Sequence, residues 1–208
     1  MTVTAKAARL VAYGAPLEVS SVELPEPSDA EVLVDLSYAA VNPVDGYAAA
    51  GKVAVDGPLP RTLGGEATGY LEGKPVLVYG GGVGSSRDGV FATAAVVPTD
   101  AVFELPMGVA LEEAAALGVV GLTAWRVVEI AGIGAGDRVL VLGAGGGVGQ
   151  SVVSYAASKG AQVWCQSTSA AKAGGSAAQN THGMLSAVSH IRPIASAGPM
   201  NAPTVSSD

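Results

Sequence analysis

Residues 139–149 read Val-Leu-Val-Leu-Gly-Ala-Gly-Gly-Gly-Val-Gly, an apolar run followed by a glycine-rich segment. Its first four apolar residues predict a buried strand, and a helical pattern runs from about Val148 to Lys159. A strand that enters a helix through a glycine turn leaves free backbone N–H groups at the positive end of the helix dipole, which suits a pyrophosphate. Gly149 is expected to let the helix pack closely on the strand. The stretch therefore predicts a dinucleotide site, with a flexible turn as the alternative.

The strand after this helix is expected over 162–165, which completes a β–loop–α–β unit, the beginning of a doubly wound parallel sheet. NAD-binding proteins usually carry an acid after that strand for the ribose 2′-hydroxyl, but residues 166–172 read Gln-Ser-Thr-Ser-Ala-Ala-Lys. Hydroxyl groups and Lys172 suit a 2′-phosphate instead, which predicts NADPH. A solvated loop with an exposed lysine is the alternative. The residues predicted to bind the cofactor are Ala144, Gly146, Gly147, Val148, Gly149, Ser167, Ser169 and Lys172.

Short apolar runs separated by Gly and Pro turns fill the first hundred or so residues and predict a small β-rich domain. A second glycine run, 80–84, is predicted to be a hairpin connection because no helix of the dinucleotide type follows it. Two helices are expected next, over 111–118 and 122–131. The expected strands are a hairpin over 7–19 and single strands over 31–38, 75–79 and 91–97.

The last part of the chain, 173–208, consists mostly of Ala, Ser, Gly, Pro and Asn, and it shows no helix or strand period. It is predicted to be a poorly ordered, low-complexity tail. The predicted domains are therefore a β-rich domain over 1–110, a partial dinucleotide-binding domain over 111–172, and this tail.

Composition narrows the class of protein. A net charge of −7 without a Lys/Arg cluster argues against binding to nucleic acid or to an anionic membrane. Cys165 is the only cysteine, which rules out an intrachain disulfide and fits a reducing compartment. The most apolar stretch, 114–125, is too short to cross a bilayer, and the beginning of the chain does not resemble a signal peptide. We therefore expect a cytoplasmic protein.

Five motifs in this order resemble the medium-chain dehydrogenases/reductases, and most closely their quinone oxidoreductase type. The resemblance covers about residues 5–172, and it implies a GroES-like β-rich catalytic domain and a Rossmann domain with the active site in the cleft between them. It also implies that Asn42, Tyr47 and Thr123 line the nicotinamide and substrate pocket, although each could instead be a turn or packing residue. The motifs are Ala-Ala-Val-Asn-Pro-Val-Asp-Gly-Tyr (39–47), Leu-Gly-Gly-Glu-Ala-Thr-Gly (63–69), Glu-Glu-Ala-Ala-Ala-Leu (112–117), Gly-Leu-Thr-Ala-Trp (121–125) and the run that ends in the glycine turn (136–149).

Zinc-dependent members of this family carry a Cys in the first motif and a His beside the Glu of the second. This chain has Asn42 to Asp45 and Gly65 at the corresponding places, so no metal site is predicted. The resemblance then implies hydride transfer from NADPH to a small carbonyl acceptor, a quinone or an enone, with the proton supplied by solvent or a pocket hydroxyl. Lys52-Val53 stand where related quinone reductases often have an aromatic residue, which favours the enone. An enoyl-thioester reductase is the alternative enzyme.

Members of the family normally continue well beyond residue 172 with more of the Rossmann domain. Two hypotheses follow from the ending found here. The chain is either a working oxidoreductase, with a homo-oligomer or a separate chain completing it, or a truncated, non-catalytic member of the same family. The sequence leaves both open.

Overall fold

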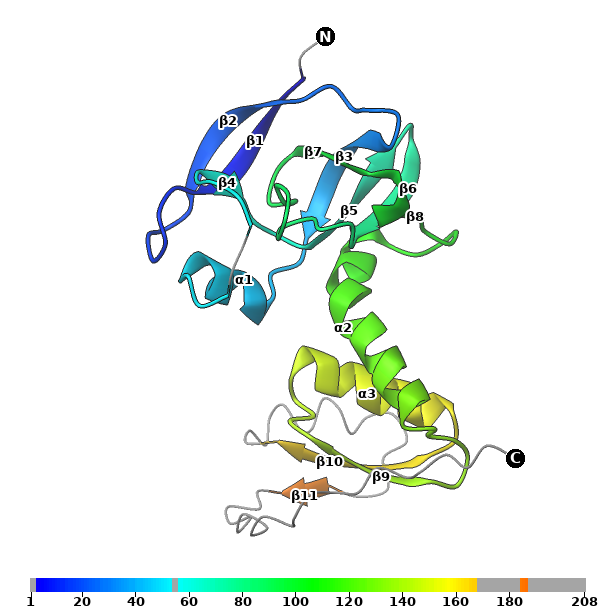
Figure 1. Cartoon of the computed structure of the whole chain (residues 1–208). Helices are drawn as coiled ribbons and strands as arrows, with labels where there is room; N and C mark the ends of the chain where they lie inside the picture. The colour runs from blue at the N-terminus through cyan, green and yellow to red at the C-terminus, as the bar shows by residue number, and fades with distance from the viewer. Residues whose placement is uncertain (1–2, 54–55, 168–183, 187–208) are drawn as a thin grey trace, which may run out of the picture. The chain divides into compact units, whose positions relative to one another are not determined.

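A computed structural model describes residues 3–53, 56–167 and 184–186. The chain divides into two compact units, Met1–Val127 and Val128–Asp208 (Figure 1). Within the described residues, none of the helices has the length and hydropathy that a membrane crossing requires.

A five-stranded antiparallel sheet forms the larger part of the first unit, in the order β7-β3-β5-β6-β8. Its buried face is made of small and β-branched side chains, among them Val34, Ala67 and Val78. Strands β5 and β6 are joined by a two-residue turn in which Glu72 and Gly73 both have positive φ, which matches the twist of a tight hairpin. The strands are β3 (Glu31–Ala39), β5 (Glu66–Leu71), β6 (Lys74–Tyr79), β7 (Ala94–Pro98) and β8 (Val102–Glu104), and the short helix η1 (Thr99–Ala101) lies between the last two.

A second, three-stranded sheet in the first unit has the order β2-β1-β4. Leu10 and Leu63 are almost completely buried in a small core that also contains Ala48. Ala48 comes from the short helix α1, so this core joins the sheet to the helix that follows Asn42. The elements are β1 (Val3–Leu10), β2 (Glu18–Leu24), α1 (Pro43–Ala49) and β4 (Arg61–Thr62).

The glycine run 80–84 does not connect a hairpin, so that prediction was wrong. Strand β6 pairs with β5 and β8, whereas β7 pairs with β3. The chain after the run instead follows residues 62–64, because Gly89 N–H donates to Thr62 O at 2.9 Å and Val90 N–H to Gly64 O at 3.0 Å. A Cβ at Gly84 would overlap the Gly64 carbonyl. The glycines therefore allow two backbone segments to approach each other.

Helix α2 (Leu111–Ile130) is continuous, so the prediction of two separate helices was wrong. Its first half is bound to β5, because the Thr68 hydroxyl donates to Leu111 O at 2.8 Å and Val119 N–H donates to the Glu66 carboxylate. These bonds explain why the compact units divide inside α2, later than residue 110. The boundary between a β-rich domain that ends at residue 110 and a dinucleotide-binding domain that begins at residue 111 stays a prediction.

The second unit contains a parallel sheet in the order β11-β10-β9, with helix α3 packed on β9 and β10. Val141, Val163 and Cys165 alternate with more exposed residues and are buried, and Val152 and Val153 of α3 are buried as well. Leu140 points the other way and is 54% exposed. The elements are β9 (Arg138–Leu142), α3 (Gly147–Ser158), β10 (Gln162–Ser167) and β11 (Met184–Ser186).

Strand β11 lies within 173–208, where the sequence predicted no element, and that prediction was wrong at this point. Its three residues run parallel to β10, with Met184 opposite Cys165 and Ser186 opposite Ser167. Three residues are too few to show an alternating pattern, and parallel pairing is made by backbone groups that every sequence carries. The sequence therefore held no signal for it.

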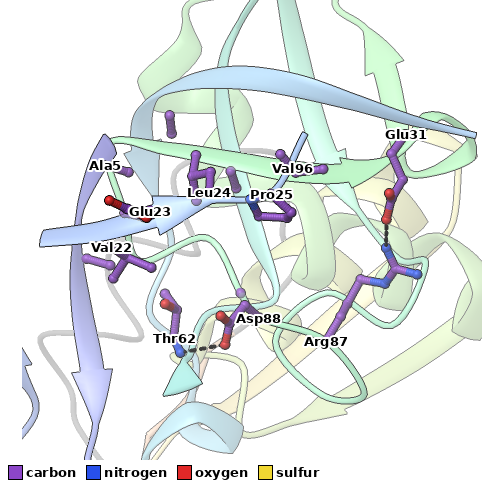
Figure 2. A pocket seen from close by; sticks show the side chains of 15 residues that line it. Ala5, Val22, Glu23, Leu24, Pro25, Glu31, Thr62, Arg87, Asp88 and Val96 are labelled. Atoms are coloured by element: carbon purple, nitrogen blue, oxygen red, sulfur yellow. Dashed lines mark hydrogen bonds and ion pairs between the residues drawn. The ribbon is translucent and has the colours of Figure 1, made fainter. Parts of the chain in front are cut away.

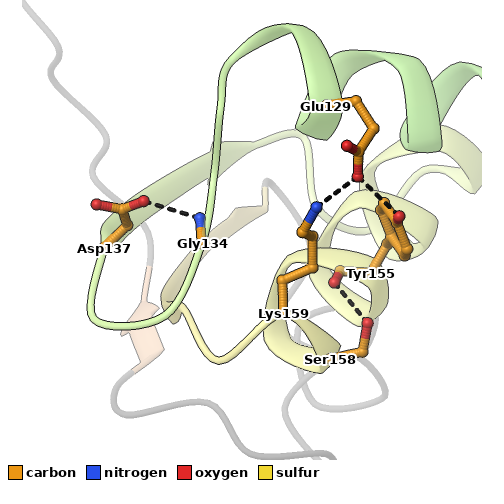
Figure 3. A network of polar contacts seen from close by, with 6 residues as sticks. All are labelled: Glu129, Gly134, Asp137, Tyr155, Ser158 and Lys159. Atoms are coloured by element: carbon orange, nitrogen blue, oxygen red, sulfur yellow. Dashed lines mark hydrogen bonds and ion pairs between the residues drawn. The ribbon is translucent and has the colours of Figure 1, made fainter.

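A polar network joins the end of α2 to α3 within the second unit (Figure 3). The Glu129 carboxylate accepts a hydrogen bond from Lys159 Nζ at 2.6 Å and another from the Tyr155 hydroxyl at 2.8 Å. The hydrogen bond from Lys159 has the larger effect, and together with the bond from Tyr155 it holds the pKa of Glu129 below its ordinary value of 4.5. The same ion pair raises the pKa of Lys159.

Glu129→Gln should lower the urea midpoint of the second unit slightly at neutral pH, because the pair is exposed and screened. A carboxyl with a lowered folded pKa stabilises the protein above its unfolded pKa, and this contribution is lost as pH falls through the folded value. The difference between variant and parent should therefore shrink below about pH 4.5. Exposed Glu18→Gln is the control. An undiminished difference at pH 3 would contradict the assignment.

Candidate functional site

Glu66 is a carboxylate buried in the first unit, with 1% of its surface exposed, and it lies at the beginning of β5. Its Oε1 accepts a hydrogen bond from Asn42 Nδ2 at 2.6 Å, and its Oε2 accepts one from Val119 N–H at 2.5 Å. Because a buried carboxylate is costly unless it is hydrogen-bonded, these two donors account for its presence in the interior. Glu66 thereby connects the loop before α1 to the middle of α2.

Gly118 makes this approach of strand and helix feasible. A Cβ at position 118 would overlap Glu66 Oε2 and would lie 3.3 Å from its Cδ. Glycine inside a helix costs about 1 kcal/mol relative to alanine, so the position carries a local penalty. The penalty is offset here because the missing side chain leaves room for the carboxylate.

Asn42 and Thr123 are joined through this cluster. The Thr123 hydroxyl donates to Val119 O at 2.6 Å, and the N–H of the same Val119 donates to Glu66. Asn42 is half-buried and Thr123 is exposed, so both side chains have surface left for a ligand. Tyr47 lies on α1 with its side chain 53% exposed and takes no part in this hydrogen-bond chain. The structure brings two of the three predicted pocket residues into one network.

Asp45 fixes the main chain at Asn42. Its Oδ2 accepts a hydrogen bond from Asn42 N–H at 2.7 Å, across the beginning of helix α1. Burial raises the pKa of the Asp45 carboxyl, and the bond from Asn42 works in the opposite direction. As pH falls, this carboxyl is therefore protonated earlier than an ordinary aspartate, and the cap on α1 weakens.

The glycine turn of the second unit has the predicted strand–turn–helix geometry. The chain leaves β9 at Gly143, where φ is +69°, and Gly146 N–H donates back to Gly143 O at 3.0 Å. Helix α3 then begins without a side-chain cap. The N–H groups of its first turn are thus left for another acceptor, such as a phosphate.

Gly149 packs against the incoming chain, as the sequence predicted. A Cβ at this position would overlap Gly143 O and lie 2.8 Å from Ala144 Cα. Ala144 is fully buried, and its N–H donates to Gln166 O at 2.9 Å, which ties the turn to the end of β10. Of the predicted residues, Ala144 and Gly146 lie in the turn after β9, and Gly147, Val148 and Gly149 form the first turn of α3.

The other predicted cofactor residues lie on or after β10. Ser167 is the last residue of that strand and is 8% exposed. Ser169 and Lys172 fall outside the described residues. The described end of β10 carries Gln166 and Ser167 and no carboxylate.

Glu66 and Gly118, which meet where β5 approaches α2, were not among the predicted site residues. The motif at 63–69 contains Glu66, but it gave this residue no predicted role. A single acid among small and apolar residues was the available signal, because a charge in a buried strand needs partners. Gly118 gave no comparable signal, since its role depends on a residue of another element.

Across residues 3–53, 56–167 and 184–186, no three His, Cys, Asp or Glu side chains gather in a way that could hold a metal ion. His182 and His190 lie outside that part of the chain. The absence of zinc stays a prediction.

A cavity of about 180 Å³ lies elsewhere in the first unit (Figure 2). Its lining includes none of the predicted pocket residues. Arg87 is paired with Glu31 at 2.8 Å, and Asp88 accepts from Thr62 N–H at 2.9 Å, so these polar groups already have partners. We assign no ligand to it.

Several proteins of known structure or curated name are similar to this chain, although no family model matches it. The human quinone oxidoreductase is 30% identical over 168 residues, which cover 76% of this chain and 51% of that protein. A zinc-type alcohol dehydrogenase-like protein of Schizosaccharomyces pombe is 32% identical over 155 residues, covering 71% and 47%. The chain thus spans about half the length of these relatives.

Solved structures agree with these relatives. The quinone oxidoreductase of Thermus thermophilus, known also in complex with NADPH, has a TM-score of 0.77 and 28% identity, covering 86% of this chain and 59% of that one. The quinone oxidoreductase of Pseudomonas syringae has a TM-score of 0.78 and 26% identity, covering 86% and 58%.

The antiparallel first unit and the glycine-turn unit after it are the architecture of medium-chain dehydrogenases/reductases, a GroES-like domain followed by part of a Rossmann domain. The predicted fold class is confirmed. Within that class, the chain belongs to the quinone oxidoreductase type.

Proposed function

We propose that this chain belongs to an enzyme that transfers a hydride from NADPH to a quinone or enone. The observation that carries the proposal is the turn from Gly143 to Gly149, which leads from a parallel strand into an uncapped helix N-terminus. The relative from Thermus thermophilus that forms a complex with NADPH supports it.

The choice of NADPH over NADH rests on charge at the ribose. An acid after β10 would repel a 2′-phosphate, and Gln166 and Ser167 introduce none. Ser169 and Lys172, although outside the described residues, would add a hydroxyl and a positive charge for that phosphate. We therefore propose NADPH as the preferred cofactor.

The proposed hydride transfer requires the protein mainly to position the acceptor next to the cofactor. NADPH, when bound, supplies the hydride, and a conjugated acceptor delocalises the charge that arrives with it. Asn42, Tyr47 and Thr123 are the proposed pocket residues. The hydroxyl hydrogen of Thr123 is engaged with Val119 O, so giving it up would break that bond. Solvent is therefore the better proton source for the reduced acceptor.

Reduction of an enoyl thioester is a second candidate. It is favoured by relatives named polyketide synthases, such as that of Mycolicibacterium smegmatis, which is 30% identical over 154 residues. Rates measured side by side with a quinone, a small enone and an enoyl thioester would rank the three acceptors. Turnover of the thioester alone would favour the second candidate.

Calorimetry with NADPH and NADH tests the cofactor proposal directly. We expect micromolar binding of NADPH and at least about tenfold weaker binding of NADH, which corresponds to about 1.4 kcal/mol. Lys172→Ala should remove most of that difference, because it removes the charge that favours the 2′-phosphate. A folded chain that binds neither nucleotide would contradict the proposal and support a non-catalytic member of the family.

A further inference from the structure

We propose that Glu66 is a positioning residue that fixes which way the Asn42 amide faces, so that Asn42 offers a hydrogen-bond acceptor to a bound ligand. The inference rests on the proposed function, because it concerns the same pocket. It assigns a role to Glu66 that the motif alone did not indicate, and it specifies the chemistry of the group that Asn42 recognises.

The orientation of the amide follows from the partners of Glu66. Both carboxylate oxygens accept hydrogen bonds, one from Asn42 Nδ2 at 2.6 Å and one from Val119 N–H at 2.5 Å. An Asn amide carries its donor and its acceptor on opposite sides of one planar group. If the Asn42 amide were turned over, Oδ1 would face an oxygen of Glu66, and no hydrogen would lie between these two acceptors. This contact would be costly, because Glu66 is only 1% exposed and water cannot compensate for it. Oδ1 of Asn42 is therefore directed away from Glu66. The capping box of α1 gives this oxygen the Asp45 N–H as one partner, and its second lone pair is left for a ligand.

The main chain at Asn42 cannot easily relax this arrangement. Its N–H donates to Asp45 Oδ2 at 2.7 Å, so the residue is held at its backbone as well as at its side chain. The other oxygen of Glu66 is anchored to Val119 in the middle of α2, beside Gly118. Strand β5, which carries Glu66, and helix α2, which binds its Oε2, therefore hold the carboxylate in place. The carboxylate in turn holds the Asn42 amide in one orientation.

Thr123 also offers a hydrogen-bond acceptor to a ligand. Its hydroxyl donates to Val119 O at 2.6 Å, so only the lone pairs of its oxygen remain for a ligand. Asn42 and Thr123 thus both offer acceptors, and the ligand group they suit is an amide N–H or a hydroxyl O–H. Thr123 has no hydrogen left for the carbonyl oxygen of a quinone or enone, and Asn42 has only the second hydrogen of its Nδ2 for such an oxygen.

A direct test observes the side-chain NH₂ of Asn42 by NMR and does not depend on turnover. In the parent chain we expect one of its two hydrogens to be shifted downfield and protected from exchange with water. Glu66→Gln, in which one oxygen becomes an NH₂ group, should remove both features or should release Val119 N–H instead. Glu104→Gln, on exposed strand β8, should leave both unchanged. An unprotected Asn42 amide in the folded parent chain would overturn the proposal, even if Glu66→Gln does not fold.

A double-mutant cycle tests whether Glu66 acts through Asn42. We expect Glu66→Gln and Asn42→Ala each to lower kcat/KM about tenfold, and the double variant to be about tenfold lower rather than a hundredfold. Independent, multiplying effects would overturn the proposal. A protected amide in a chain without turnover would support the role of Glu66 and contradict the proposed function, so the two failures are distinguishable.

Discussion

Gly149→Ala should weaken NADPH binding by at least about tenfold, or about 1.4 kcal/mol. The new Cβ would overlap Gly143 O and approach Ala144 Cα, so the turn or the beginning of α3 must move. Both neighbours are backbone atoms, and such overpacking costs about 1 to 3 kcal/mol. The helix N–H groups would then no longer converge on one phosphate. Calorimetric titration of the variant with NADPH measures the loss.

Gly134→Ala is the matched control for this experiment. It also replaces a glycine of the second unit, but its Cβ would come only within 4.0 Å of Asp137 Oδ2, an ordinary contact. We expect its affinity for NADPH to equal that of the parent chain. Unchanged affinity in Gly149→Ala would mean that the turn is not the nucleotide site.

Gly118→Ala and Gly121→Ala should change stability in opposite directions, although both replace a glycine inside α2. At Gly121 the new Cβ would lie 3.7 Å from Leu117 Cβ, and the gain in helix propensity should stabilise the protein by up to about 1 kcal/mol. At Gly118 it would displace the buried Glu66 carboxylate from its two donors. Since those bonds satisfy a buried carboxylate, we expect a net loss of about 1 to 3 kcal/mol.

Urea unfolding of the three proteins, followed by circular dichroism, measures these differences. The comparison is sharp because helix propensity, composition and distance from the helix ends are nearly the same for the two variants. If Gly118→Ala were as stable as Gly121→Ala, the close approach of Glu66 to α2 would be wrong.

The strand–turn–helix geometry of the glycine turn could be predicted from sequence because its determinants are local. A strand, a glycine run and a helix follow one another within residues 138–158, and each glycine acts on neighbours a few positions away. The same reason explains why the strands β3, β6 and β10 were found near their observed places. Alternation and turn residues carry that information within one segment.

The residues that were missed depend on contacts between distant segments. Gly118 looks like a helix breaker until Glu66, far away in the sequence, is placed against it. The glycines of 80–84 look like a hairpin until Gly84 is seen against the Gly64 backbone. Asn42 was proposed from its motif, but its hydrogen-bond partner could only be identified once β5 and α2 were in place. Local patterns contain no record of such neighbours.

The position of Cys165 gives the second unit a built-in reporter of its opening rate. The side chain is 1% exposed, on the face of β10 that α3 covers, and burial raises the pKa of its thiol. Only thiolate reacts quickly with a disulfide reagent, so the closed unit is protected both sterically and chemically. Because this is the only cysteine of the chain, the time course of modification reports the transient exposure of this one buried side chain. Ligands that hold the turn and α3 together would lengthen that time course.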